Sequence, residues 1–217
     1  KGELLEELEI PEGVTSIKSY AFYNCKSIKS VKLPESITIM GSSAFRGCSN
    51  LKSVKMLDSV TSIGSYAFAE CSSLDSVNIP NGVMSIESCA FEGCSNLKSV
   101  KLPDSVTSIG SYAFYVCSRL NSIDIPDNVT SIGSYTFYGC SGLTSINIPN
   151  TVTNIGYFAF YGCSVLSKIY IEDLASYLNI NFSNGYANPC YYAGGSLYLK
   201  GELLEELEIP EGVTSIK

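Results

Sequence analysis

A 23-residue repeat runs through most of this chain and constrains its fold more than any other feature. A cysteine, with a phenylalanine three positions before it, returns at this interval in seven successive copies. The cysteines are Cys25, Cys48, Cys71, Cys94, Cys117, Cys140 and Cys163, and the phenylalanines are Phe22, Phe45, Phe68, Phe91, Phe114, Phe137 and Phe160. A period of about 20 to 50 residues is typical of solenoids, in which each repeat forms one coil stacked on the last.

Each copy carries eight apolar positions, which predict a core inside the coil. In the first copy, residues 28–33 end in the strict alternation of a strand with one buried face. Residues 14–17 are rich in β-branched side chains and predict a second short strand on the opposite wall. Residues 19–22 predict a short helical or 3₁₀ turn. A proline follows the first strand at a corner in most copies, and Leu57 replaces it in the third.

Two copies carry a known repeat pattern almost letter for letter. Residues 97–117 read LKSVKLPDSVTSIGSYAFYVC, and residues 120–140 read LNSIDIPDNVTSIGSYTFYGC. The pattern resembles the BspA-like, or treponemal-type, leucine-rich repeat, and the resemblance covers residues 8–171 and resumes at 207. It implies a β-rich solenoid of the leucine-rich-repeat type, built from stacked 23-residue coils with parallel strands and short turns. It also implies a surface-exposed or secreted protein of a host-associated microbe, of a kind linked to adhesion.

The regular pattern breaks after Ile171. We expect a single solenoid over residues 1–217, divided into regular coils in 1–171, an irregular helix and hairpin excursion in 172–206, and the start of the next coil in 207–217. Within the excursion, residues 173–178 predict a short helix, and Lys200 with Gly201 predicts a hairpin turn. The next strand of the repeat is expected at residues 207–209.

Residues 200–217 repeat residues 1–18 without a change. The duplication fits one period of a larger super-repeat, and an engineered duplication is the alternative. Neither end shows the polar capping repeat that solenoids normally carry. We therefore expect end-to-end self-association through open coils.

Catalytic and metal sites find little support in this sequence. The chain has no histidine, which removes Ser-His-Asp and Cys-His nucleophile systems and the commonest metal ligand. Carboxylates recur with the repeat instead of forming a unique pair, so a carboxylate-only glycosidase is a remote alternative. The cysteine ladder supplies one thiol per coil, not the paired ligands of a zinc site. We expect no enzyme activity and no cofactor or metal.

The ladder cysteines are interpreted as buried free thiols that act as small hydrophobic side chains. Stacked at about 4.8 Å, their parallel Cβ atoms stay farther apart than a disulfide allows. Cys89 replaces a tyrosine of its column, and Cys190 lies in the irregular unit. These two cysteines are expected to be exposed.

The charge of the chain bears on its partners and location. Its formal net charge is −7, and an acidic chain is a poor ligand for polyanions, so we expect no nucleic-acid partner. No stretch approaches 18 apolar residues, so no membrane span is expected, and no signal peptide is recognisable in this segment. The resemblance implies an extracellular or cell-surface location.

The remaining expectations concern binding surfaces. The leading one is a non-enzymatic interaction scaffold, an adhesin-type module that binds a host or matrix protein or a glycan. A structural spacer within a long surface array, with no ligand of its own, is the alternative, and ice binding by regular hydroxyl columns is a third. The candidate ligand-binding residues are tyrosines near the irregular unit and a basic column on the predicted sheet: Tyr170, Tyr177, Tyr186, Tyr191, Tyr192, Tyr198, Lys32, Lys55 and Lys101. Tyrosine is favoured at interfaces because it offers a large apolar area with a polar tip.

Overall fold

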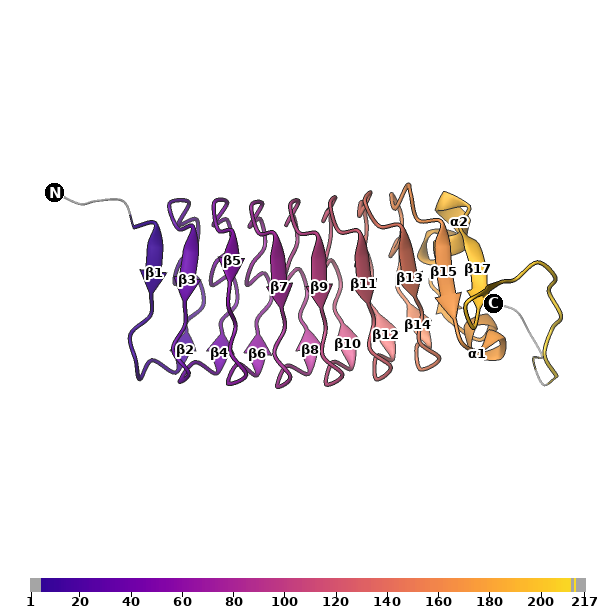
Figure 1. The fold of residues 1–217 in the computed structure, drawn as a ribbon, viewed down its shortest axis with the longest axis horizontal. Helices are drawn as coiled ribbons and strands as arrows, with labels where there is room; N and C mark the ends of the chain where they lie inside the picture. Colours follow the sequence, from indigo (N-terminus) through magenta and orange to yellow (C-terminus); the bar gives the residue numbers. More distant parts are fainter. Residues whose placement is uncertain (1–4, 212, 214–217) are drawn as a thin grey trace.

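The computed structural model describes residues 5–211 and residue 213. Each 23-residue repeat forms one coil, and the coils stack along a single axis into a rod (Figure 1). One wall of the rod, the sheet wall, carries the strands β1 (Glu7–Glu9), β3 (Ser30–Lys32), β5 (Ser53–Val54), β7 (Ser76–Asn78), β9 (Ser99–Lys101), β11 (Ser122–Asp124), β13 (Ser145–Asn147), β15 (Lys168–Ile171) and β17 (Ser196–Leu199). The predicted parallel solenoid is confirmed.

The opposite wall, the back wall, carries two-residue strands and the turns that follow them. Its strands are β2 (Ser16–Ile17), β4 (Ile39–Met40), β6 (Ser62–Ile63), β8 (Ser85–Ile86), β10 (Ser108–Ile109), β12 (Ser131–Ile132), β14 (Asn154–Ile155) and β16 (Asn181–Phe182). On both walls the regular strands pair in parallel with a shift of 23 residues, as in Leu8 with Val31 and Ile109 with Ile132, except between β11 and β13 and between β6 and β8, where no ladder is found among the described residues. This constant register places each sequence column in a straight line along the rod.

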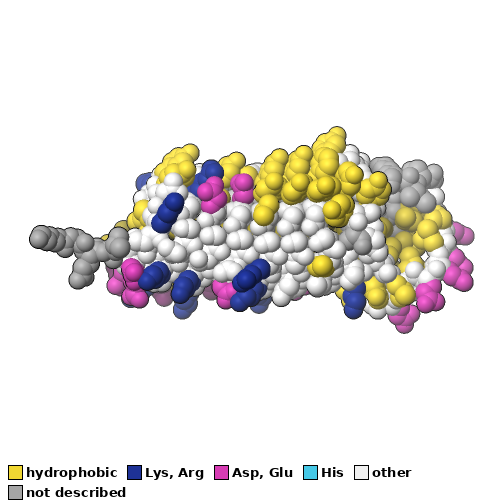
Figure 2. All heavy atoms as spheres, turned by 90° about the horizontal axis from the view of Figure 1, so that it is seen from above, with side chains coloured by type: hydrophobic (Ala, Val, Ile, Leu, Met, Phe, Trp, Pro, Cys, Tyr) yellow, Lys and Arg dark blue, Asp and Glu magenta, His cyan; other side chains and the backbone are white. Residues whose placement is uncertain are grey.

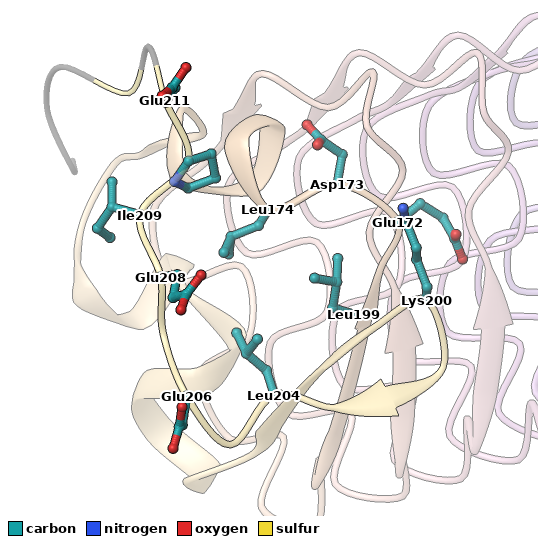
Figure 3. Close-up of a pocket in the computed structure, with 11 residues that line it drawn as sticks. Glu172, Asp173, Leu174, Leu199, Lys200, Leu204, Glu206, Glu208, Ile209 and Glu211 are labelled. Carbon is teal, nitrogen blue, oxygen red and sulfur yellow. The ribbon is translucent and has the colours of Figure 1, made fainter.

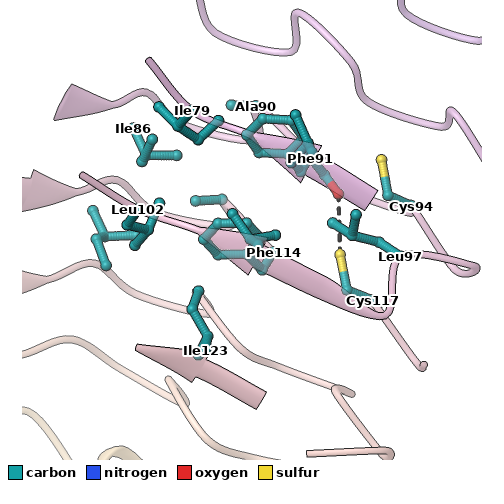
Figure 4. Packing of buried hydrophobic residues seen from close by; sticks show 14 of the residues in the cluster. Ile79, Ile86, Ala90, Phe91, Cys94, Leu97, Leu102, Phe114, Cys117 and Ile123 are labelled. Atoms are coloured by element: carbon teal, nitrogen blue, oxygen red, sulfur yellow. Dashed lines mark hydrogen bonds between the residues drawn. The ribbon is translucent and has the colours of Figure 1, made fainter. Parts of the chain in front are cut away.

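The core consists of such columns of buried side chains, and the phenylalanine column has the largest of them (Figure 4). We call it the phenylalanine ladder. Neighbouring rings are stacked with centroids 5.2 to 5.7 Å apart from Phe22 to Phe160. The cysteine ladder lies beside it, and each thiol from Cys48 to Cys163 donates to the carbonyl of a phenylalanine 26 residues earlier. Cys117 Sγ, for example, lies 3.2 Å from the carbonyl oxygen of Phe91.

All described ladder cysteines are free thiols, and only Cys25 in the first coil is partly exposed. The expectation that Cys89 is exposed is wrong: its residue is 5% exposed. Its short side chain lies between Tyr66 and Tyr112, the longer side chains of the same column in the adjacent coils. Cys190 is half-buried and lies 3.4 Å from the hydroxyl of Tyr177.

The turn predicted for residues 19–22 takes the form of successive β-turns rather than a helix. Ala21 N donates to Lys18 O at 3.2 Å within the coil, whereas Tyr20 N donates to Ser42 O at 3.0 Å in the next coil. Alternate backbone N–H groups thus hold the turn and the stack together, which a helix would not permit.

The corner without proline keeps the geometry of the others. Val60 N donates to Leu57 O at 2.9 Å, and the equivalent bond from Ile37 N to Pro34 O is 3.2 Å. The tight turn therefore does not depend on proline.

The irregular unit continues the stack with a longer coil. It contains α1 (Leu174–Leu178), capped by Asp173, the 3₁₀ turn η1 (Gly185–Ala187) and α2 (Pro189–Ala193). β16 pairs in parallel with β14, and β17 pairs in parallel with β15. β17 then turns into the short antiparallel strand β18 (Glu202–Leu203), as the hairpin signal predicts.

The next sheet-wall strand therefore begins at Ser196, not at residues 207–209 as the sequence suggests. Ile169 faces Leu197, a shift of 28 residues instead of 23. Residues 204–211 contain no strand, and the side chains of Leu207 and Ile209 are exposed. The hairpin occupies the free edge of β17, so a further parallel strand has no place to pair there. Residues 212 and 214–217 of the expected next coil lie outside the described residues.

Candidate binding surface

The back wall carries a surface of stacked aromatic side chains over its last four coils. We call this surface the aromatic face and define it by nine residues: Tyr112, Tyr115, Tyr135, Tyr138, Phe158, Tyr161, Tyr186, Tyr191 and Tyr192. In the regular coils they occupy two columns, three residues apart, on the β-turns after β10, β12 and β14. η1 and α2 of the irregular unit extend both columns by one coil.

Rings of one column stack from coil to coil. Along the first column the centroids lie 4.7 to 5.4 Å apart, from Tyr112 to Tyr186. Along the second they lie 4.8 to 5.1 Å apart, from Tyr115 to Tyr192. Contacts of 5.5 to 5.9 Å join the columns within a coil, as between Tyr135 and Tyr138. Because most rings stack along the rod axis, their faces cover one another and their edges and hydroxyl groups point outward.

The backbone under the first column is held in an unfavourable conformation. Tyr112, Tyr135 and Phe158 have φ angles of 55° to 60°, in the left-handed region. For a residue with a Cβ this region costs about 1–2 kcal/mol, which glycine avoids. A neighbouring left-handed column does use glycine, at Gly139 and Gly162 for example. Ser43 and Cys89, at the same position of earlier coils, have φ angles of 55° and 59°, so this conformation belongs to the repeat and not to the rings.

The aromatic face lies opposite the charged side of the rod. Figure 2 shows its apolar side chains along one edge of the molecule, with a row of lysines and carboxylates along the other. Nearer the first coil the back wall is charged: Arg46 Nη2 lies 2.7 Å from Glu70 Oε1 and the guanidinium stands 4.9 Å above the Tyr66 ring. From Tyr112 onward these turns carry no charged residue.

Three of the predicted site residues belong to the aromatic face. Tyr186 stacks on Phe158 at 5.3 Å, and Tyr191 and Tyr192 are 64% and 42% exposed. The six aromatic residues before residue 170 are not among the predicted site residues. Their signal was present, because tyrosine or phenylalanine returns at 112, 135 and 158 and again at 115, 138 and 161.

The other predicted residues lie elsewhere. Tyr177 is buried, with its hydroxyl 3.1 Å from Asn188 Oδ1, and burial raises its pKa. It belongs to the core of the irregular unit and is not available to a ligand. Tyr170 and Tyr198 pack with their ring centroids 5.1 Å apart and their rings tilted by 43°, on the sheet wall away from the aromatic face. They continue the column that holds Lys32, Lys55 and Lys101.

The lysines of the sheet wall do not form a free basic strip. Lys32 Nζ lies 2.6 Å from Glu9 Oε1, and this contact raises the pKa of Lys32. In the adjoining column, Lys29 and Lys98 pair with Glu6 and Asp75, each at 2.8 Å. Lys55 and Lys101 are exposed, and no ion pair to either is found among the described residues. Local carboxylates thus balance much of the positive charge.

Neither a metal cluster nor a membrane helix is found within residues 5–211 and 213. No three cysteine or carboxylate side chains there are grouped to hold a metal ion. None of the helices in that part of the chain has the length and apolar character needed to cross a membrane.

Three solved bacterial structures share this fold. A leucine-rich repeat protein from Bacteroides ovatus is 30% identical, with a TM-score of 0.59 over 77% of this chain and 49% of its own. The T. pallidum leucine rich repeat protein is 28% identical, with a TM-score of 0.54 over 76% and 68%. A leucine rich cell surface protein from Faecalibacterium prausnitzii is 29% identical, with a TM-score of 0.51 over 79% and 64%. No curated protein matches the chain.

This chain spans about half the length of the Bacteroides ovatus protein. Residues 1–118 and 63–188 match the family model described as the BspA type leucine rich repeat region, in six copies. Together these residues cover most of the sequence, and the register of the strands explains the 23-residue spacing of the motif. The chain belongs to the BspA-type leucine-rich repeat family.

Proposed function

We propose that this chain is a non-enzymatic binding module, of the adhesin type, that holds a protein partner on its aromatic face. The observation that carries the proposal is the uncharged double row of stacked rings along the back wall. A solenoid can stack without it, since the coils nearer the first carry Ser43, Arg46 and Ala69 in the same two columns. Aromatic side chains are enriched in binding hot spots because they bury a large area at little cost in conformational entropy.

The orientation of the rings favours a protein over a glycan. A sugar ring packs on an exposed aromatic face, and here the faces along both columns are largely covered by their neighbours. Along the two columns the surface that remains consists mainly of ring edges and phenolic hydroxyl groups, which contact side chains and backbone carbonyls of a protein. The relative from Faecalibacterium prausnitzii is a cell surface protein, which supports a cell-surface or extracellular location for this chain.

The test is a binding screen of the chain against immobilised extracellular-matrix proteins and a glycan array. The variant Tyr135→Ala with Tyr138→Ala and Tyr161→Ala removes three neighbouring rings from the centre of the face. We expect saturable binding to a matrix protein, weakened at least about 10-fold in this variant, because central aromatic residues dominate binding energy.

The matched control is Tyr20→Ala with Tyr23→Ala, which changes the same two columns in the first coil. These residues lie on the back wall outside the aromatic face, and the control is expected to bind like the wild type. Circular dichroism checks that all variants are folded. Equal binding by both variants would place the site elsewhere, and binding to glycans alone would refute a protein partner. An absence of any saturable binding would favour the spacer alternative.

A further inference from the structure

The same 18-residue sequence occurs at residues 1–18 and 200–217, and the described parts of the two copies have different structures. In the first copy Glu7–Glu9 form β1, which pairs in parallel with β3. In the second copy, Glu202–Leu203 form the antiparallel β18, and residues 204–211 form no strand. The same sequence therefore pairs as a parallel strand of the sheet in the first copy and does not in the second.

The side chains show the same difference. Leu8 and Ile10 are 9% and 7% exposed, whereas their counterparts Leu207 and Ile209 are 57% and 46% exposed. Apolar side chains of this size are stabilised by burial. Leu207 and Ile209 of the second copy are thus exposed to solvent, whereas the same two side chains of the first copy lie in the core.

β3 recognises the first copy through backbone and charge. Ile10 N donates to Lys32 O at 3.0 Å, and Lys29 N donates to Glu6 O at 2.6 Å. Lys29 and Lys32 also form ion pairs with Glu6 and Glu9 at 2.8 and 2.6 Å. Residues 205–211 carry the same carboxylates, amides and apolar side chains in the same order, so they are complementary to β3 in the same way.

The second copy is loosely held where it lies. Leu204 and Ile209 line an open cavity of about 670 Å³ beside Leu199, together with Glu206 and Glu208 (Figure 3). Glu206 and Glu208 lie across the cavity from Glu172 and Asp173, and Lys200 lines it beside those two carboxylates. Little of the segment's own packing would be lost if it moved away.

The first coil is also the easiest to open. Val14, Phe22 and Cys25 are only half-buried, unlike their counterparts in the following coils. β1 has a paired neighbour on one side only among the described residues. Elements with few buried contacts open at the lowest free energy.

The second copy cannot fill this place in its own chain. Eight steps of about 4.8 Å separate β1 from β17, or about 38 Å. The six residues between β17 and Glu206 span at most about 20 Å when fully extended. Any exchange must therefore occur between two molecules.

We propose that residues 205–211 of one molecule replace residues 6–12 beside β3 of a second molecule. The contact is heterologous and does not close on itself, so repetition produces head-to-tail chains. It supplies a specific contact for the end-to-end association expected from the sequence.

The chain offers a matched pair of full-length variants. Leu8→Asp with Ile10→Asp weakens the resident strand, and Leu207→Asp with Ile209→Asp makes the same change in the incoming segment. At about 100 µM, light scattering on a sizing column is expected to give the first variant at least twice the mass of the second. The variant with all four changes is expected to be monomeric. A monomeric first variant that stays folded, or association of the fourfold variant, would overturn the proposal.

A second measurement uses the wild-type chain, in case the first variant does not fold. A labelled peptide with the sequence KGELLEELEIPEGVTSIK is incubated with the chain and coupled with a carbodiimide, which joins lysines to carboxylates in contact. Mass spectrometry is expected to find the peptide on Lys29 or Lys32. A peptide with aspartate in place of the leucine and isoleucine at positions 8 and 10 is expected to give less than a tenth of this product. Equal labelling by both peptides, or labelling spread over all lysines, would refute strand exchange.

Discussion

At the scale of single residues, the cysteine ladder combines packing with hydrogen bonding. The thiols from Cys48 to Cys163 fill the core beside the phenylalanines and donate to their carbonyl groups. Burial raises the pKa of Cys48, Cys94 and Cys163 from 9.0 to about 12. These thiols therefore remain protonated in the folded protein at a pH where those of the unfolded chain ionise.

This difference predicts a loss of stability in alkali. Above pH 9 the unfolded state binds fewer protons than the folded state, so the free energy of unfolding falls with pH until about pH 12. The loss is about 1.4 kcal/mol per thiol at pH 10. Urea denaturation with a reducing agent at pH 8, 9 and 10 measures the slope. The variant Cys94→Ala with Cys163→Ala is expected to show a shallower slope by two thiols, and an unchanged slope would contradict the prediction.

At the scale of elements, the corners between strands tolerate different residues because hydrogen bonds define them. Leu57 forms the same corner as Pro34, with the same bond from the residue three positions later. No backbone bond from Leu57 N is found among the described residues. The change Leu57→Pro therefore removes no observed hydrogen bond.

We expect Leu57→Pro to stabilise the protein by about 0.4–1 kcal/mol, because proline reduces the conformational entropy of the unfolded chain. The midpoint of urea denaturation measures this change. Pro103→Ala at the equivalent corner is the matched control and is expected to shift the midpoint in the opposite direction. A destabilised Leu57→Pro variant would show that the third corner differs from the rest.

At the scale of the whole molecule, stability is expected to vary along the rod. Each coil contacts only its neighbours, and the side chains of residues 14–25 are less buried than their counterparts in the central coils. Val14 and Phe22 are accordingly half-buried, whereas Phe68, Phe91 and Phe114 are fully buried.

Hydrogen exchange followed by mass spectrometry should show this gradient. We expect amides of residues 10–25 to exchange at least about 10-fold faster than those of residues 68–117, because a coil with fewer buried side chains opens locally without unfolding the rest. Peptides from equivalent positions of successive coils serve as internal controls. Equal protection in the first and central coils would contradict the one-dimensional view of this solenoid.

Much of the fold was predictable because equivalent positions in successive coils have the same surroundings. Columns such as that of Phe22 and that of Cys25 return every 23 residues, and a side chain buried in one coil is buried in the next. The six early members of the aromatic face were equally visible as columns. They were not predicted as site residues, because the sequence does not show whether a tyrosine side chain on a turn points into the core or to solvent. The stacked coils show that successive rings lie on one wall.

The sequence by itself determined the solenoid, its coil length, its buried columns and its parallel register, since all of these follow from local periodicity. Only the tertiary structure decided that Cys89 is buried, that Tyr177 belongs to the core, and that one 18-residue sequence is a strand at residues 7–9 and not at 206–208. In each case the deciding factor is the neighbouring coil. A strand forms, and a side chain becomes buried, only where another coil offers hydrogen bonds and apolar surface to complete it.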